Sequence, residues 1–180
     1  FLMAVDERIG KLKRKKELLE EYKRGMMQKL FSQKVRFKDE HGQDYPGWIE
    51  KRFSDVVVRR KKKNTSPSKD SCCVEMDSIE KETGRLLVVY PVPDLSRTIF
   101  FKHDILFGKL RPYLRKFWRA EFDGVCSSEF WVFDGERSSK LTKYLIQTRE
   151  FRRASSIAEG SKMPRADWSV VRKCRVRVPV

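Results

Sequence analysis

The N-terminal part of the chain carries its apolar residues at helical spacing. Residues 3–31 contain no proline, and their apolar positions recur at steps of three or four, interrupted once around Lys16. This spacing draws a narrow stripe along a helix, of the kind used by a packed pair of helices. We predict one helix over 3–31, about 40 Å long at ~1.5 Å per residue. Its packing stripe consists of Val5, Ile9, Leu12, Leu19, Tyr22, Met26 and Leu30.

The pattern changes after Ser32. Residues 35–47 contain the turn-forming pairs His41-Gly42 and Pro46-Gly47, which is typical of a linker. From Trp48 onward the apolar segments are short, aromatic or β-branched, and separated by turn residues, as in β-strands. We predict strands around Val56–Arg59, Cys73–Glu75, Leu86–Tyr90, Ile105–Leu110, Lys116–Ala120, Val125 with Glu129–Phe133, and Cys174–Val178.

Short helices and tight turns are expected among these strands. Residues 138–153 show a helical pattern, and Asp167 is placed to cap a short helix over Trp168–Arg172. The Phe-Asp-Gly triplets at 122–124 and 133–135 predict turns in which glycine takes a positive φ.

The predicted fold class is therefore α+β. A long N-terminal coiled-coil-type helix is followed by a mostly β domain with short helices. The predicted organisation is a spacer or dimerisation helix over 1–34, a linker over 35–47 and the β domain over 48–180.

Charge is the strongest compositional signal. The 180 residues include 41 Lys and Arg against 25 Asp and Glu, a net charge of +16. This excess favours a polyanionic partner but does not by itself separate DNA, RNA and a membrane surface. No uncharged apolar run approaches the ~18–20 residues of a membrane helix. Four cysteines without C-x-x-C spacing argue against a disulfide scaffold or a zinc site, and favour a cytoplasmic location.

Enzyme signatures are absent from the chain. It has no phosphate-binding P-loop, no G-x-G-x-x-G and no Pro-Pro of a DNA amino-methyltransferase motif. Ser127-Ser128-Glu129 has only His103 in the β domain as a possible activating base, and His103 itself is expected to be an exposed turn residue. We expect no covalent chemistry, no metal and no cofactor in this chain.

Basic residues alternate with aromatic ones over 102–119. On a strand–turn–strand, alternation would send the apolar side chains inward and present the cations on one surface. Pro112 would fix the turn and the direction of Arg111. Arginines held in this way suit forked recognition of guanine edges or phosphate. The proposed contacts here are Lys109, Arg111, Tyr113, Arg115, Lys116 and Arg119, with Ser127 and Ser128 nearby.

Two further basic clusters flank this segment. One comprises Arg59, Arg60, Lys61, Lys62, Lys63 and Asn64, and the other includes Lys162 and Arg165. Both are candidate DNA-contacting loops, although a solvated charged face explains the first equally well. The block 124–133, with Ser127 and Ser128, also has the composition of strand core.

Four stretches together resemble the specificity subunit of type I restriction–modification enzymes. They are FLMAVDERIGKLKRKKELLEEYKRGMMQKLFS (1–32), VRFKDEHGQDYPGWIEKRFSDVV (35–57), DILFGKLRPYLRKFWRAEFDGVCSSEFWVF (104–133) and SKMPRADW (161–168). They are similar, in that order, to the family's conserved helix, the junction into a target recognition domain, the main block of that domain, and the segment near its end. The family carries two recognition domains and two helices, whereas this chain has one of each.

The resemblance implies a non-catalytic subunit that reads one part of a split duplex DNA target. Modification subunits, which carry the S-adenosylmethionine chemistry, and restriction subunits would dock on it. The helix would act as a spacer, packed against the second helix of a full-length chain or against a copy of itself.

Other function classes remain open on the residues alone. Tyr113, Phe117 and Trp118 would suit stacking in a single-strand or RNA-binding module. A protein adaptor whose basic helix binds an acidic partner and a metal-dependent nuclease are further alternatives. A membrane-surface role is disfavoured, because the helix has acidic residues among its basic ones and no Trp on its stripe.

Overall fold

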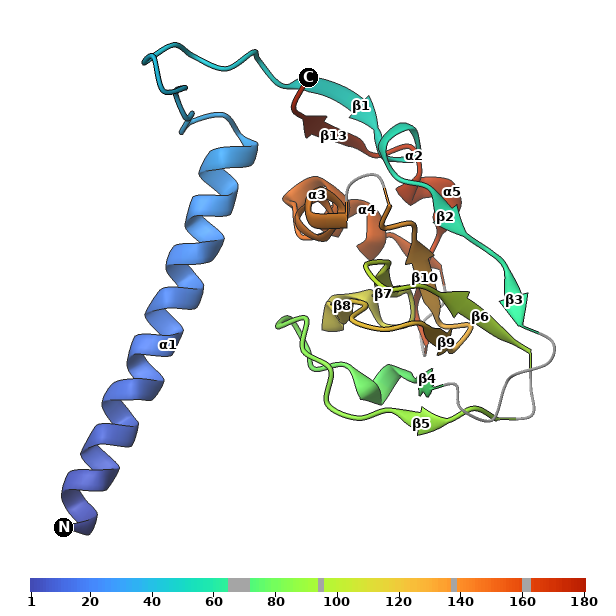
Figure 1. The fold of residues 1–180 in the computed structure, drawn as a ribbon, viewed down its shortest axis with the longest axis horizontal. Helices are drawn as coiled ribbons and strands as arrows, with labels where there is room; N and C mark the ends of the chain where they lie inside the picture. Colours follow the sequence, from blue (N-terminus) through green and yellow to red (C-terminus); the bar gives the residue numbers. More distant parts are fainter. Residues whose placement is uncertain (65–71, 94–95, 137–138, 160–162) are drawn as a thin grey trace. The chain divides into compact units, whose positions relative to one another are not determined.

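The chain divides into two compact units. A computed structural model describes residues 1–64, 72–93, 96–136, 139–159 and 163–180 (Figure 1). One unit comprises 1–49 with 179–180, and the other comprises 50–178.

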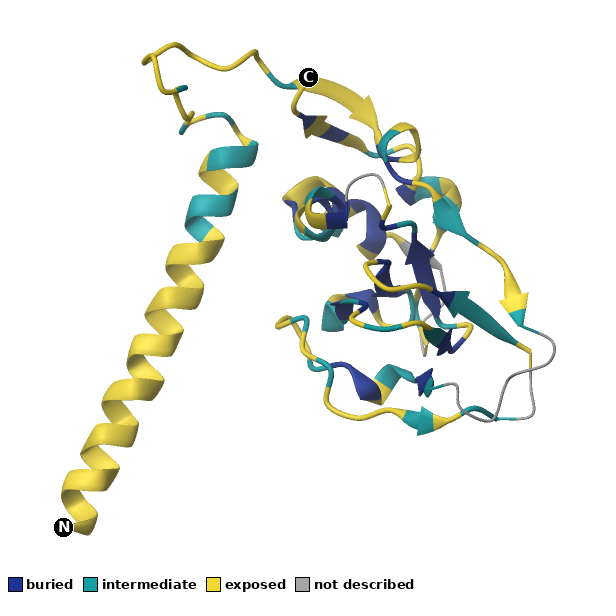
Figure 2. Cartoon of the chain, viewed as in Figure 1, coloured by how far each residue is buried: buried dark blue, intermediate teal, exposed yellow. Residues whose placement is uncertain are grey.

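The first unit is dominated by helix α1, Leu2–Phe31, which confirms the predicted long helix. No residue of α1 is buried (Figure 2). Most of its apolar stripe is open to solvent, with Leu12 54% and Leu19 57% exposed, whereas Met26 and Leu30 are half-buried. The helix ends where the Ser32 N–H donates to the Gln28 carbonyl and Gln33 takes a left-handed φ of 58°. A long helix with an exposed apolar stripe lacks the burial that normally stabilises such a helix.

The second unit is built from short strands and helices. The strands are β1 (Ile49–Arg52), β2 (Arg59–Arg60), β3 (Lys63–Asn64), β4 (Cys72–Val74), β5 (Tyr90–Pro91), β6 (Arg97–Phe100), β7 (Ile105–Gly108), β8 (Phe117–Arg119), β9 (Gly124–Cys126), β10 (Phe130–Phe133), β11 (Ala158–Glu159), β12 (Arg165–Ala166) and β13 (Arg175–Val178). The helices are α2 (Phe53–Val56), α3 (Ser139–Leu145), α4 (Arg149–Ser156) and α5 (Trp168–Val171), with 3-10 turns η1 (Met76–Ser78) and η2 (Pro112–Leu114).

Two main sheets form the body of this unit. The first has the strand order β2-β10-β7-β8, and its pairs are antiparallel. The second has the order β3-β6-β9-β4-β5, in which only β4 and β9 run parallel among the described strands. Smaller pairs join β1 with β13 and β11 with β12. The mostly β architecture with short helices confirms the predicted α+β class.

The first sheet is covered on both faces. On one face, Leu106 of β7 and Val132 of β10 belong to a core with Phe100 and Cys126 of the second sheet. On the other face, the Phe107 ring lies 5.0 Å from that of Phe151 on α4. Trp131 and Phe133 lie on the same face as Phe107, and their ring centroids are 5.4 and 6.0 Å from that of Trp168 on α5. Every residue of β7 and β10 is consequently buried.

This double burial corrects the expected alternation within 102–119. The neighbouring residues Phe117 and Trp118 of β8 are both buried, although they point to opposite faces of the sheet. The expectation of one apolar and one cationic face was wrong, because helices cover one face and the second sheet covers the other. Cations are therefore found where the strands end and in the loop between β7 and β8.

Several predicted elements differ in their bounds. Residues 53–56 form the short helix α2, so the strand predicted from Val56 begins only at Arg59. The predicted helix over 138–153 is two helices, since Thr148 caps a new one by accepting the Phe151 N–H. The short helix capped by Asp167 and the last strand are confirmed.

The two Asp-Gly glycines serve close packing. Among the described glycines, only Gly42 and Gly84 have a positive φ, so the expectation for Gly124 and Gly135 was wrong. A Cβ on Gly135 would lie 2.1 Å from the His103 carbonyl oxygen, and one on Gly124 would lie 2.7 Å from that of Cys72. The absence of a side chain allows these backbones to approach each other.

A buried carboxylate joins strand ends of the first sheet to the end of β6 in the second sheet. Asp104, 1% exposed, accepts the Phe101 N–H at 2.9 Å and the Gly135 N–H at 2.8 Å. It also accepts Nε of Arg60 at 3.0 Å, and Asp134 accepts another nitrogen of Arg60 at 2.9 Å. Burial lowers the pKa of Arg60, but the hydrogen bond and charge of Asp104, with the charge of Asp134, outweigh this and raise it. Arg60, a candidate DNA contact in the sequence, therefore has its guanidinium bound within the domain.

We predict that Asp104→Ala destabilises the protein by about 2–4 kcal/mol, because Nε of Arg60 and two backbone N–H groups lose their acceptor. Urea denaturation followed by tryptophan fluorescence measures this loss. Glu121→Ala, at an exposed position, is the control and should change stability by less than about 0.5 kcal/mol. Equal stability of the two variants would contradict the structural role given to Asp104.

Candidate nucleic-acid interface

The loop between β7 and β8 has a strained, well-defined backbone. Arg111 and Arg115 flank η2, and both have left-handed φ values, 49° and 48°. Within the turn, the Leu114 N–H donates to the Arg111 carbonyl and the Arg115 N–H to the Pro112 carbonyl. A left-handed backbone costs an ordinary residue roughly 1–2 kcal/mol. Two such residues around one turn must be held by their surroundings, which is common at functional sites.

Neighbouring segments supply that support. The Arg111 N–H donates to the Pro164 carbonyl at 2.7 Å, and the Ala166 N–H donates to the Lys109 carbonyl at 2.9 Å. On the other side, the Lys109 N–H donates to the Glu129 carbonyl at 2.9 Å. Three segments that are distant in sequence therefore lie side by side at the Gly108 end of β7.

This arrangement brings together many of the candidate residues. We define the loop cluster as Lys109, Arg111, Tyr113, Ser128 and Arg165. Arg111 and Ser128 are exposed, and Tyr113 is 58% exposed. Ser127 lies under the cluster and is buried, with its hydroxyl oxygen accepting the Glu129 N–H. Lys162, two residues before Pro164, lies outside the described residues.

Arg165 is oriented by a carboxylate. Its Nε lies 3.0 Å from Oε2 of Glu129 and its terminal nitrogen 3.1 Å from Oε1, a forked pair that raises the pKa of Arg165. The Arg165 side chain remains 46% exposed. An exposed ion pair contributes only about 0–1 kcal/mol. Another anion can therefore replace Glu129 at small cost.

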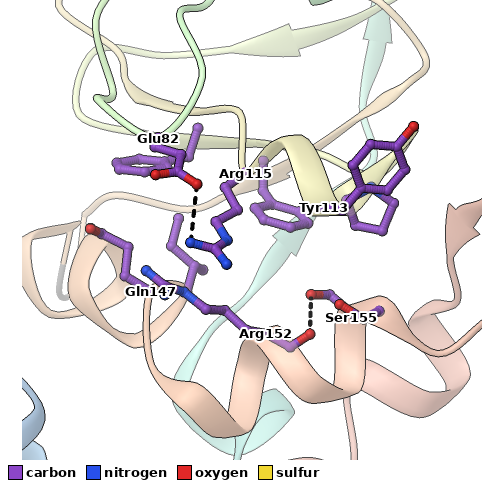
Figure 3. A pocket seen from close by; sticks show the side chains of 11 residues that line it. Glu82, Tyr113, Arg115, Gln147, Arg152 and Ser155 are labelled. Atoms are coloured by element: carbon purple, nitrogen blue, oxygen red, sulfur yellow. Dashed lines mark hydrogen bonds and ion pairs between the residues drawn. The ribbon is translucent and has the colours of Figure 1, made fainter. Parts of the chain in front are cut away.

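Arg115 has a similar exposed partner. Its guanidinium lies 3.1 Å from Oε1 of Glu82, and the Glu82 N–H donates to the Arg115 carbonyl at 3.2 Å. Glu82 also has a left-handed backbone, with φ 65°. The pair borders a cavity of about 100 Å³ beneath η2 (Figure 3). The cavity is lined by Glu82, Phe107, Pro112, Tyr113, Arg115, Phe117, Ile146, Gln147, Arg152, Ser155 and Ser156.

Lys116 and Arg119 make contacts within the domain. Lys116 Nζ donates to the Met76 carbonyl at 2.5 Å, and burial lowers the pKa of Lys116. Arg119 Nε donates to the hydroxyl of buried Ser139 at 2.6 Å. The sequence expectation of one outward-facing row of cations was wrong for both residues, because each side chain bonds to a group within the domain.

The cluster from Arg59 to Asn64 begins at the Phe133 end of β10, and Arg60 already pairs with Val132, one residue nearer to the loop cluster. Arg59 pairs with Phe133, whereas the loop cluster begins beyond the pair Gly108–Phe130, about 10 Å further along the sheet at ~3.3 Å per residue. Arg59 lies over the Trp168 ring at 4.9 Å, and Arg60 is bound to Asp104. Exposed cations of this segment are Lys61, Lys62 and Lys63, and Asn64 is half-buried.

Sequence reasoning missed the arginines of α4. Phe151 and Ala154 of this helix are buried, while Arg149 and Arg153 are exposed. A shallow depression lined by Arg149, Arg152, Arg153, Ser156 and Ile157 adjoins the cavity under η2 and shares Arg152 and Ser156 with it. The signal was available, since an apolar pair at i and i+3 within REFRRA predicts that the arginines face outward.

The site chemistry is that of anion binding. Among the residues that the structure describes, no three His, Cys, Asp or Glu side chains gather to hold a metal ion. All four cysteines are free, and burial raises the pKa of Cys73 to about 11 and that of Cys174 to about 11. No helix in the described part of the chain is long and apolar enough to span a bilayer. The exposed groups instead offer guanidinium, ammonium and hydroxyl donors.

The fold and the loop cluster define a basic α+β domain that follows a long helix. Its fold is similar to that of the HsdS subunit from Thermoanaerobacter tengcongensis, with a TM-score of 0.57 and 19% identity over 74% of this chain. It is also similar to a chain from a study of complex assembly and conformational transition of the type I R-M system, with a TM-score of 0.55, 18% identity and the same coverage.

The predicted resemblance to type I specificity subunits is thus confirmed at the level of the fold. The chain spans 38% of each of these two solved chains. No protein-family model and no curated protein matches the sequence.

We predict that Arg119→Ala lowers the free energy of unfolding by about 1 kcal/mol, because the bond to Ser139 is lost. Lys61→Ala removes the same charge at an exposed position and should have an effect below about 0.5 kcal/mol. Chemical denaturation distinguishes the two variants. A larger loss for Lys61→Ala would show that the cations have been assigned to the wrong roles.

Proposed function

We propose that this chain is a DNA-recognition part of a type I restriction–modification specificity subunit. It reads one part of a bipartite duplex target and performs no catalysis itself. The observation that carries the proposal is the loop cluster, in which Arg111 and Tyr113 are exposed at a 3-10 turn that is flanked by left-handed residues and held by two neighbouring segments. The similarity of the fold to the HsdS subunit supports this proposal.

The loop cluster suits duplex recognition because its backbone is held in place before binding. A forked guanidinium matches two acceptors on a guanine edge or on a phosphate. Arg111 projects from a turn whose N–H is bonded to the Pro164 carbonyl, so little backbone entropy is lost on binding. Lys109 and Arg165 lie on the adjoining segments, where they would contact phosphates and set the register.

The single-strand alternative loses two of its three stacking candidates. Phe117 is 4% exposed and Trp118 is 2% exposed, so neither ring has a free face for a base. Tyr113 alone remains available. Stacking platforms use successive aromatic rings, and the described residues therefore favour the duplex proposal.

The remaining parts of the proposal concern assembly. Helix α1 acts as a spacer whose stripe packs against the second helix of a full-length chain or against a second copy. Modification and restriction subunits dock on this framework in the cytoplasm, and S-adenosylmethionine binds to the modification subunit. The open apolar stripe of α1 supports a helical partner.

We predict that Arg111→Gly weakens the preference for target over non-target duplex by about 1–3 kcal/mol if Arg111 reads a base edge. Glycine fits the left-handed backbone at this position, so the variant keeps or raises the melting temperature and removes only the side chain. Selection of bound duplexes from a random library first identifies the target, and fluorescence anisotropy then measures both affinities.

Contact with phosphate alone gives a different result. Binding to all sequences then weakens equally, and the slope of log affinity against log salt falls by about one. Unchanged affinity and unchanged slope would remove Arg111 from the interface. Failure of the wild-type chain to bind any duplex would contradict the proposed function itself.

We also predict self-association through α1. Leu12→Glu combined with Leu19→Glu places charges in the exposed stripe and should convert a dimer into a monomer. Light scattering at tens of micromolar protein measures the mass. Lys13→Glu with Lys23→Glu, which changes charge outside the stripe, serves as the control. A stable wild-type monomer would contradict self-association.

A further inference from the structure

The cavity under η2 gathers donors from separate elements. Arg115 enters it from the end of η2, Arg152 from α4 and Gln147 from the turn before α4. Figure 3 shows these polar side chains around one space, with the Glu82–Arg115 pair at its upper side. Ser155 and Ser156 add hydroxyl groups, and Phe107 with Phe117 forms part of an apolar wall. A volume of about 100 Å³ is several times the ~10–15 Å³ that one water molecule needs, which gives room for an oxyanion group.

The charge around the cavity is mostly positive. The adjoining depression shares Arg152 and Ser156 with the cavity and adds Arg149 and Arg153. Among the described residues that line the two hollows, Glu82 is the only acidic one. Arginines gathered in this way attract polyanions. The carboxylate of Glu82 forms an ion pair with one of them, Arg115.

Stability does not account for Glu82. The residue has a φ of 65°, a conformation that glycine or asparagine adopts with less strain. Its ion pair with Arg115 is 51% exposed on the Glu82 side and 41% exposed on the Arg115 side, and pairs of that kind contribute little to folding. The turn itself is held by a backbone bond from the Glu82 N–H to the Arg115 carbonyl, which needs no acidic side chain. We therefore look for the role of the Glu82 carboxylate in its ion pair with Arg115, where it occupies the guanidinium that another anion could bind.

We propose that the cavity under η2 binds a phosphodiester group of the DNA backbone, and that Glu82 occupies this site as an internal competitor in the free protein. The inference rests on the proposed function, since it assumes that duplex DNA is the partner. It adds Arg152, Arg149 and Arg153 of α4 to the DNA interface.

The exchange has a simple electrostatic basis. A phosphodiester replaces the Glu82 carboxylate at Arg115, and the forked guanidinium fits either anion. Glu82 then repels any backbone that does not approach closely enough to gain the arginine contact. On non-target DNA, where few base contacts offset this repulsion, binding is weakened most. The competitor therefore increases discrimination by penalising the wrong complex.

The test measures the affinity of variants of the 180-residue chain for a target and a non-target duplex across a salt series. Glu82→Gln should bind the non-target duplex about threefold to tenfold more tightly and the target less than twofold more tightly. Arg115→Gln and Arg152→Gln should each weaken binding to both duplexes and lower the salt slope by about one. Glu121→Gln removes an exposed charge outside the cavity and controls for net charge. Melting temperatures show that each variant is folded.

Combination of the variants separates competition from general repulsion. In an Arg115→Gln background, Glu82→Gln should have almost no further effect on affinity, because the pair it regulates is absent. Full additivity, or an equal gain from Glu121→Gln, would overturn the role of Glu82. Unchanged binding by Arg115→Gln and Arg152→Gln would overturn the phosphate site. If Arg111→Gly still relaxes sequence preference, the proposed function survives either result.

A second arm uses inorganic phosphate alone. If the cavity is a site for the DNA backbone, inorganic phosphate should raise the melting temperature of the protein no more than chloride does at equal ionic strength. A rise in the wild type that disappears in Arg152→Gln, together with unchanged duplex binding by that variant, would overturn the assignment to DNA and indicate a site for a free phosphate.

Discussion

Burial of β7 and β10 on both faces is the constraint on which the rest of the domain depends. Rings from α4 and α5 cover one face, and the second sheet covers the other. Polar side chains on these strands have no solvent face, so cations are confined to strand ends and to the connecting loop. The carboxylate of Asp104 is buried just before β7, and it is acceptable there because two backbone N–H groups and Arg60 satisfy it. The packed sheet thus gives the loop a rigid base.

The strained backbone of the β7–β8 loop depends on this rigid base. Arg111 and Arg115 adopt backbone conformations that ordinary residues avoid, and bonds to segments near residues 129 and 164 hold the loop. The result is a turn whose side chains are positioned before any ligand arrives. Exposed arginines beside this turn are paired with Glu82 and Glu129. Since such pairs are weak in water, the acids moderate the positive charge without removing the arginines from use.

Much of the architecture could be predicted from the sequence, because its signals are local. Helix α1 follows from an uninterrupted helical period, and the cap at Asp167 from one residue beside a short helical pattern. The order of several motifs predicted the fold seen in the HsdS subunit. The sequence named Lys109, Ser128 and Arg165 as candidate contacts but did not predict that they lie together. Backbone bonds between distant segments bring them together, and no local pattern predicts those bonds.

The sequence by itself determined the surplus of positive charge, the long helix with its apolar stripe, and the basic, aromatic-rich segment around Pro112. Tertiary structure alone decided which cations are available. Arg60, Lys116 and Arg119 bond to groups within the domain, while Arg111 remains exposed. The glycines at 124 and 135 likewise permit close backbone approach, where the local motif had indicated a turn. The physical reason is that a charge or a glycine acquires its role from partners distant in the chain, whereas helical periodicity needs only neighbouring residues.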